Sequence, residues 1–221
     1  MNQKPDLIYN CLMRTYRTVN LNVLWFLIAL NLLIFIAELI TGGGIAARSP
    51  LISFLGLTPA LLSKQPWTII SSMFVHGSFT HILFNMISLY FLGSFLIRAV
   101  GEKSFLTVFF LGGLAGNILC FVLAYLVLRG IIPTLFGDPF TPGIGASGGI
   151  FALGGALAVM VPRVPVIVFP IPVPISLWVA ILIFLFLSFV PGIAWQAHVG
   201  GFFLGLVAGL IFRKRRRTYY F

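Results

Sequence analysis

The stretch AHVGGFFLGLVAGLIF, residues 197–212, is an apolar run with His198 near its start and glycines at positions 200, 201, 205 and 209. A second run of the same kind, GASGGIFALGGALAVM, residues 145–160, carries Ser147 near its start. Small residues spaced four apart let membrane helices approach closely. The two runs therefore predict a pair of closely packed membrane helices. A polar or ionisable side chain inside a membrane helix is costly, so Ser147 and His198 are taken as candidate functional residues.

The composition of the whole chain indicates a membrane protein. Its 221 residues are 60% hydrophobic and 8% charged, against about 25% charged in a soluble domain. Six apolar segments have lengths that suit spanning helices: 22–41, 79–97, 104–128, 146–161, 175–190 and 195–212. We expect an all-α membrane protein, a six-transmembrane-helix bundle with a long, membrane-associated outer loop (42–78) between its first two helices.

The distribution of basic residues predicts the orientation of the bundle. Six crossings place both termini on one side, and with that side cytoplasmic the inner segments hold eleven basic residues and the outer segments three. This bias follows the positive-inside rule. We expect a cytoplasmic N-tail (1–20), a six-helix domain (21–212) and a basic cytoplasmic C-tail (213–221). The expected location is a prokaryotic plasma membrane, in a multi-pass protein.

The net charge of +10 does not indicate nucleic-acid binding. Five of the 14 basic residues form the cluster Arg213–Arg217 at the end of the last apolar run, where they serve as an orientation signal and can contact anionic lipid. No folded basic domain accompanies them. The expected partners are the lipid bilayer and membrane-spanning proteins. The sequence leaves the oligomeric state open.

Ser147 and His198 are predicted to lie at one depth. Ser147 is 16 residues from Arg163, and His198 is 15 residues from Arg213, the basic residues that mark the inner ends of their helices. At about 1.5 Å per residue, both lie roughly 20–26 Å above the inner boundary of a hydrocarbon core about 30 Å thick. The pair is therefore expected below the outer surface, where a serine and a base can hydrolyse a peptide bond.

The four acidic residues of the chain narrow the choice of hydrolytic mechanism. Asp6 and Glu102 are expected to be cytoplasmic, Glu38 near the outer end of the first helix, and Asp138 in an outer loop. None lies on the helices that carry Ser147 and His198, so a Ser–His dyad is favoured over a triad. Hydrolysis of the aspartyl type needs two buried aspartates, and the sequence offers at most Asp138. No zinc-protease motif is present. No metal and no cofactor is expected.

Other polar residues in the apolar segments have two readings each. His81 and Asn85 lie one turn apart on one helix face and can donate to an oxyanion, or they bridge helices by hydrogen bonds. The glycines around Ser147 and His198 either bring the two side chains together or only pack the helices. His76 is expected to be either a loop histidine or one that lies behind the site residues and supports them. Asn31 and Asn117 are expected to bond between helices.

The order of these motifs resembles the rhomboid family of intramembrane serine proteases. The matching pieces are His81-x-x-x-Asn85, Gly145-Ala146-Ser147-Gly148 and Ala197-His198-x-x-Gly201-x-x-x-Gly205, on the second, fourth and sixth helices. The resemblance spans about residues 20–212. Two positions depart from it: Thr68 follows Trp67 where rhomboids often have arginine, and Ile97 stands where a glutamate is common.

The resemblance implies a role for each matching residue. Ser147 would be the nucleophile, His198 the base, and Asn85 and His81 the oxyanion donors. Phe151, where many members have tyrosine, would stack on the His198 ring, and Gly145, Gly201 and Gly205 would serve packing. The substrate would be a membrane-spanning protein, cut near the outer end of its helix after a small residue.

The alternative to an enzyme is a catalytically inactive rhomboid-like protein that binds membrane helices. Inactive relatives typically lack the serine or the histidine, and both are present here. Access for the substrate is expected from the side, past bulky residues of the fifth helix such as Trp178, Phe184 and Phe186. The proline-rich segment 162–174 is expected to be an extended inner connection, and Pro191-Gly192 a mobile one.

Overall fold

The computed structural model describes residues 20–168, 173–190 and 192–218, with side chains as far as Arg213 at the C-terminal end. The predicted N-tail (1–20) therefore lies outside the described residues except for Asn20, as does Pro191. The predicted C-tail (213–221) is described as far as Thr218, and it continues the last helix beyond the predicted boundary at residue 212.

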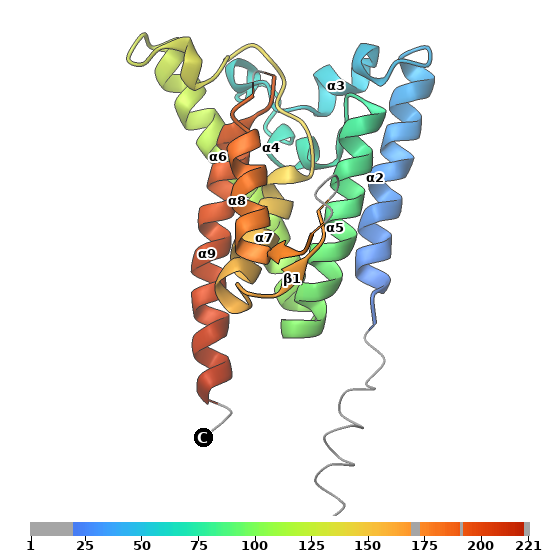
Figure 1. The fold of residues 1–221 in the computed structure, drawn as a ribbon. Coiled ribbons are helices and arrows are strands. Elements are labelled where there is room, and N and C mark those ends of the chain that lie inside the picture. Colours follow the sequence, from blue (N-terminus) through green and yellow to red (C-terminus); the bar gives the residue numbers. More distant parts are fainter. Residues whose placement is uncertain (1–19, 169–172, 191, 219–221) are drawn as a thin grey trace, which may run out of the picture.

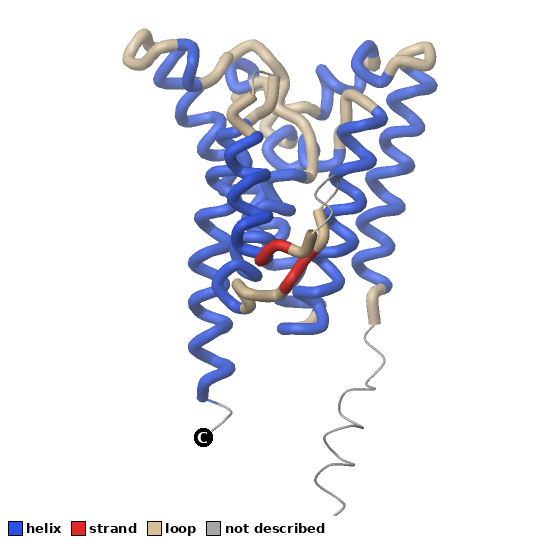
Figure 2. The backbone as a smooth tube through the Cα atoms, viewed as in Figure 1, coloured by secondary structure: helices blue, strands red, loops and turns tan. Residues whose placement is uncertain are grey.

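Each of the six apolar segments forms a helix, and the helices stand side by side in one bundle (Figures 1 and 2). They are α2 (Asn22–Thr41), α5 (Phe79–Val100), α6 (Glu102–Leu128), α7 (Ser147–Met160), α8 (Leu177–Leu187) and α9 (Trp195–Thr218). Among the described residues, four are long and apolar enough to cross a membrane: α2, α5, α6, and α9 as far as Arg213. The chain is thus a helical, multi-pass membrane protein. Six crossings remain a prediction, because α7 and α8 have only 14 and 11 residues.

The segments between the helices contain short regular elements. Residues 42–78 include α3 (Pro50–Leu55), α4 (Thr68–Ser71) and single turns at Ala46–Arg48, Pro59–Leu61 and Ser72–Phe74. A further turn lies at Thr134–Phe136. At the other end of the bundle, β1 (Pro165–Val166) pairs antiparallel with β2 (Ile175–Ser176).

The small β1–β2 sheet is an addition to the helical bundle that the sequence did not predict. Segment 162–174 was expected to be an extended inner connection, because its prolines exclude a continuous helix. Residues 165–166 of this segment are extended and form β1, which brings Val166 opposite Ile175, the residue that directly follows the segment. β-branched residues favour such pairing. The sequence showed the absence of helix, but it did not show the pairing.

Helix α7 lies at the centre of the bundle, in contact with α5, α6, α8 and α9. The face of α7 toward α9 packs directly against the α9 backbone. A Cβ added at Gly155 would lie 2.5 Å from the Phe202 carbonyl oxygen, and one added at Gly201 would overlap the Gly148 carbonyl oxygen. Only glycine permits this approach, so the glycines bring the α7 and α9 main chains into direct contact.

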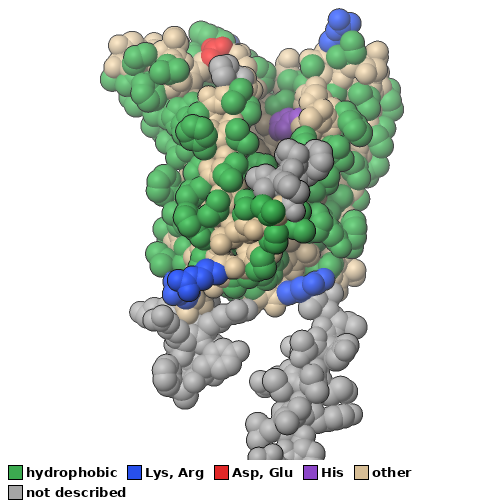
Figure 3. All heavy atoms as spheres, viewed as in Figure 1, with side chains coloured by type: hydrophobic (Ala, Val, Ile, Leu, Met, Phe, Trp, Pro, Cys, Tyr) green, Lys and Arg blue, Asp and Glu red, His purple; other side chains and the backbone are tan. Residues whose placement is uncertain are grey.

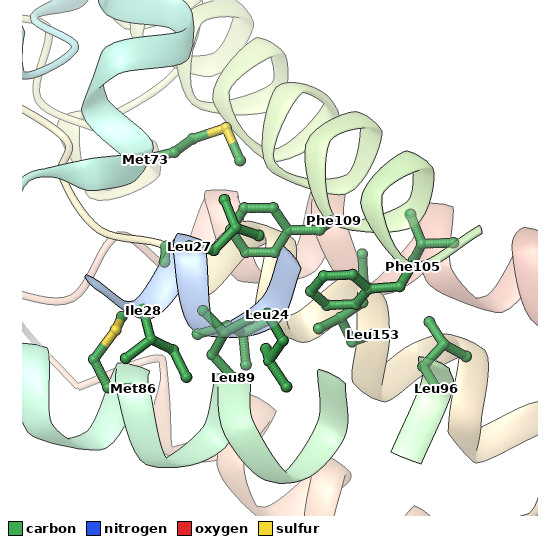
Figure 4. Close-up of a cluster of buried hydrophobic side chains, with 14 of the residues drawn as sticks. Leu24, Leu27, Ile28, Met73, Met86, Leu89, Leu96, Phe105, Phe109 and Leu153 are labelled. Carbon is green, nitrogen blue, oxygen red and sulfur yellow. The ribbon is translucent and has the colours of Figure 1, made fainter. Parts of the chain in front are cut away.

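A separate apolar cluster joins the other side of α7 to α2, α5 and α6. Leu24, Leu89, Phe105 and Leu153 are fully buried at its centre, and Figure 4 shows their side chains converging from these four helices. Phe109 stacks beside Phe105 at a ring distance of 6.2 Å. This cluster fixes α5, and with it the residues of its first two turns, against α7.

The outer surface of the bundle is apolar. Large hydrophobic side chains of the long helices are exposed, among them Phe26, Phe91, Leu111 and Phe203. Figure 3 shows this apolar surface covering the bundle, with basic side chains at the end where α9 terminates and also at the opposite end. An apolar surface of this extent would be unstable in water and suits contact with lipid tails.

Candidate active site

Ser147 and His198 meet at the α7–α9 contact. Ser147 is the first residue of α7 and His198 lies in the first turn of α9. The Nε2 atom of His198 is 2.7 Å from Ser147 Oγ, although the two residues are 51 positions apart in the sequence. His198 is buried and Ser147 half-buried. The structure thus brings together the two residues that the sequence singled out, at hydrogen-bond distance.

The segment before Ser147 is held by the loop 42–78. Leu57 and Gly143 exchange two backbone hydrogen bonds of 2.9 and 2.8 Å, and the Gly145 N–H donates to the Ser72 carbonyl oxygen at 2.8 Å. The Asn117 amide of α6 donates to the Ser72 hydroxyl at 2.9 Å. These bonds fix the direction in which the chain enters α7.

Gly145 allows a histidine to approach this entrance. Its φ is +116°, a conformation that side chains disfavour, and a Cβ there would lie 2.6 Å from His81 Nε2 and 3.7 Å from Ser147 Oγ. The imidazole of His81 therefore borders the serine hydroxyl across a glycine. Figure 3 shows histidine atoms in an opening of the apolar surface in this half of the molecule.

Asn85 lies one turn after His81 in α5 and is buried. Its amide nitrogen donates to the His81 carbonyl oxygen of the same helix at 2.9 Å, and its Oδ1 has no partner among the described residues. Among the described contacts, Asn85 therefore makes no hydrogen bond to another helix, although bridging of helices was the alternative reading of this residue. They also include none between Asn85 and Ser147.

Phe151, one turn after Ser147, stacks on the ring of His198. The ring centroids are 4.4 Å apart and the planes are inclined by 25°. Such a stacked pair restricts the plane of the imidazole.

Ser188 is a site residue that the sequence analysis missed. It follows directly after α8, is buried, and places its Oγ 2.6 Å from His198 Nδ1. The same Oγ donates to the Phe184 carbonyl oxygen at 2.8 Å. The only signal in the sequence is one hydroxyl at the end of a wholly apolar helix. His198 thus has a hydroxyl at each ring nitrogen.

A second polar contact lies behind His81. His76, in the loop before α5, is fully buried, and its backbone N–H donates to both carboxylate oxygens of Glu38 at 3.1 and 3.2 Å. Its ring lies 4.9 Å from that of His81. Burial first, and then the proximity of His81, lower the pKa of His76 from its usual 6.5 to about 3, so this ring is neutral at physiological pH.

Within the described residues, no group of three or more His, Cys, Asp and Glu side chains is arranged to hold a metal ion. The candidate site consists of hydrogen-bonding side chains: two serines, histidines and an amide.

The fold and this Ser–His pair define a class, that of polytopic helical membrane proteins with a serine and a histidine paired inside the bundle. Residues 63–215 match the sequence profile of the rhomboid domain. The chain belongs to the rhomboid family.

Several curated proteins of this family are similar to the chain. "Rhomboid protein 1, mitochondrial" of Saccharomyces cerevisiae is 27% identical over 161 residues, which cover 66% of this chain and 42% of that protein. "Rhomboid-like protease 3" of Toxoplasma gondii is 25% identical, covering 71% and 55%. "Rhomboid protease GluP" of Bacillus subtilis is 28% identical, covering 60% and 23%. The chain spans about a quarter to a half of the length of these relatives.

Proposed function

We propose that this chain is an intramembrane serine protease that cuts transmembrane segments near their outer ends, with Ser147 as nucleophile and His198 as general base. The observation that carries the proposal is the 2.7 Å contact between Ser147 Oγ and His198 Nε2 inside the bundle. Membership in a family with named proteases supports the same activity. A nucleophile and base at this distance are the central requirement of serine catalysis.

The reaction assigns one task to each group. His198 Nε2 accepts the proton of Ser147 Oγ as the oxygen attacks the scissile carbonyl, and it then passes this proton to the departing amine. Water, activated by the same nitrogen, hydrolyses the acyl-enzyme. The backbone N–H of Ser147 opens α7 and has no acceptor within the helix, so it can donate to the oxyanion together with Asn85 and His81.

The length of α7 supports a recessed site within the membrane. Its 14 residues span about 21 Å, short of a hydrocarbon core of about 30 Å. With its last residue at the inner boundary, Ser147 lies several Å below the outer one. We assign the basic end of the bundle, both termini included, to the cytoplasm of a prokaryotic cell, and count α7 and α8 as the fourth and fifth of six crossings.

The loop 42–78 is assigned to the outer leaflet, against the bundle. Phe54, Trp67 and Ile70 are 43–54% exposed in this loop, which suits a lipid environment better than water. Trp67 also fastens the loop to itself by donating from its indole N–H to the Phe54 carbonyl oxygen at 2.8 Å. Water then reaches the site from the outer side, past this loop.

Labelling by a serine-reactive fluorophosphonate tests the proposal. The protein in detergent should label, Ser147→Ala should not, and His198→Ala should lose both labelling and cleavage of a co-reconstituted single-span substrate. The double variant should be no worse than either single variant, because the pair acts as one unit. An unlabelled, folded wild-type protein that still binds single-span helices would instead identify an inactive helix-binding rhomboid.

A further inference from the structure

Ser188 joins the end of α8 to the histidine of the site. Its Oγ has two neighbours, the Phe184 carbonyl oxygen at 2.8 Å and His198 Nδ1 at 2.6 Å. The contact with the histidine crosses between helices, and the contact with the carbonyl lies within one turn. Ser188 is 3% and His198 8% exposed, so water does not readily replace either bond.

The proton count at Ser188 decides the direction of both bonds. A serine hydroxyl has one proton, and a carbonyl oxygen can only accept. Since the hydroxyl proton goes to Phe184, Oγ meets His198 with a lone pair, and Nδ1 must donate. A neutral imidazole carries one proton, so Nε2 is left with its lone pair directed at Ser147 Oγ.

We infer that Ser188 is a positioning residue that holds His198 in the tautomer protonated on Nδ1, the one form of the neutral ring whose Nε2 can accept the Ser147 proton. This inference rests on the proposed protease function. Among the described residues, no carboxylate bonds to His198. Glu38, the buried acid, bonds to the His76 backbone instead.

A neutral hydroxyl suits this position in a membrane. A carboxylate orienting the base would need its own charge stabilised in a medium of low dielectric constant, which is costly. The hydroxyl orients the ring through an uncharged hydrogen bond, and its own orientation is set by its hydrogen bond to the Phe184 carbonyl oxygen. The base is therefore oriented from α8, whereas the nucleophile belongs to α7.

Nitrogen-15 NMR of histidine in the detergent-solubilised protein tests the tautomer without reference to activity. At neutral pH the His198 signals, assigned by their loss in His198→Gln, should show a protonated Nδ1 and an unprotonated Nε2. In Ser188→Ala the Nε2-protonated form should become populated. A wild-type ring protonated on Nε2 would overturn the inference, even if the enzyme proves active.

Kinetics give the second readout. Ser188→Ala should lower both the fluorophosphonate labelling rate of Ser147 and kcat by about tenfold or more, as expected when a buried donor loses its partner, with KM little changed. Ser188→Thr, which keeps the hydroxyl, should recover much of the loss. The matched control is Ser94→Ala, because Ser94 is also buried and bonds to a carbonyl of its own helix, Phe91, at 3.1 Å.

The outcomes separate the two proposals. If the wild type neither labels nor cleaves, the protease function fails. If the wild type is active and a folded Ser188→Ala labels at the wild-type rate, the protease function stands and the role of Ser188 is refuted. A loss in Ser188→Ala that Ser188→Thr does not recover, with the tautomer unchanged, also refutes it, since the defect is then one of packing.

Discussion

Substituting Gly201 by alanine should inactivate the protein without unfolding it. Gly201 lies one turn after His198, and its α-carbon faces Gly148, the neighbour of Ser147. A Cβ at position 201 would overlap the Gly148 carbonyl oxygen and lie 2.8 Å from its carbonyl carbon, whereas ordinary contacts lie at 3.4–4 Å. The start of α9 must therefore move away from α7 at the level of the Ser–His pair.

The contact between the added Cβ and the Gly148 carbonyl carbon sets the smallest distance by which the start of α9 must move. Relieving it from 2.8 to 3.4 Å needs about 0.6 Å, and the carbonyl oxygen demands more. Added to the 2.7 Å between His198 Nε2 and Ser147 Oγ, this gives about 3.3 Å or more, beyond a normal hydrogen bond. A displacement approaching 1 Å costs about 10²-fold in rate. Overpacking costs about 1–3 kcal/mol, and replacing a helical glycine returns about 1 kcal/mol, so the fold should survive.

The assay compares Gly201→Ala with Gly154→Ala in the same bundle. A Cβ at Gly154 would meet side-chain atoms of Ile181 at 3.3–3.5 Å, and these can adjust. Fluorophosphonate labelling and substrate cleavage should fall by about 10²-fold in Gly201→Ala and stay near wild type in Gly154→Ala, with both melting transitions cooperative. Wild-type activity in Gly201→Ala would refute the reasoning that backbone contact sets the Ser–His distance.

Three further predictions concern other parts of the site. Asn85→Ala should lower kcat by roughly 10²–10³-fold if its amide donates to the oxyanion; a drop in melting temperature with kcat unchanged would contradict this. His76→Phe should flatten the pH dependence of the free energy of unfolding. The pKa of His76 in the folded state, about 3, lies below its usual 6.5, so His76 disfavours the folded state progressively as pH falls from about 6.5 toward 3. A melting-temperature profile from pH 7.5 to 5 that is no flatter than that of the wild type would count against this. Phe184→Ala, at an exposed position on α8, should raise cleavage of a full membrane-spanning substrate if lateral access limits the rate, without changing fluorophosphonate labelling; unchanged cleavage would place the access route elsewhere.

The sequence was sufficient to locate six helical segments and to single out Ser147 and His198, whose side chains are in contact in the structure. The approximate ends of these apolar segments can be read from the sequence, because charged and proline-rich segments separate them. The glycines in the 197–212 run could mean only packing, or packing that joins two functional groups. In the structure the Gly201 contact with Gly148 lies beside the 2.7 Å contact between Ser147 and His198, so the packing does bring these two side chains together.

Contacts that depend on side-chain direction could not be read from the pattern. Asn31 was expected to bond between helices, but its amide donates to the Leu27 carbonyl oxygen of its own helix at 2.7 Å, so that expectation was wrong. Asn117 does bond outside its helix, to the Ile69 carbonyl oxygen at 2.8 Å. A carbonyl four residues back is always within reach of a short polar side chain, and spacing does not show which acceptor it takes. Ser188 was missed for the same reason.

The chain order of α7, α8 and α9 has a consequence for biosynthesis. Translation delivers the helix with the proposed nucleophile first, then the helix that ends at Ser188, and last the helix with His198. A nascent chain that has inserted only as far as α8 holds a serine without a base, and the glycine surface of α7 has no backbone to meet. If the chain is the protease proposed above, its activity would therefore arise in one step, at the insertion of α9, and a chain inserted only as far as α8 would not cleave neighbouring membrane proteins at the translocon.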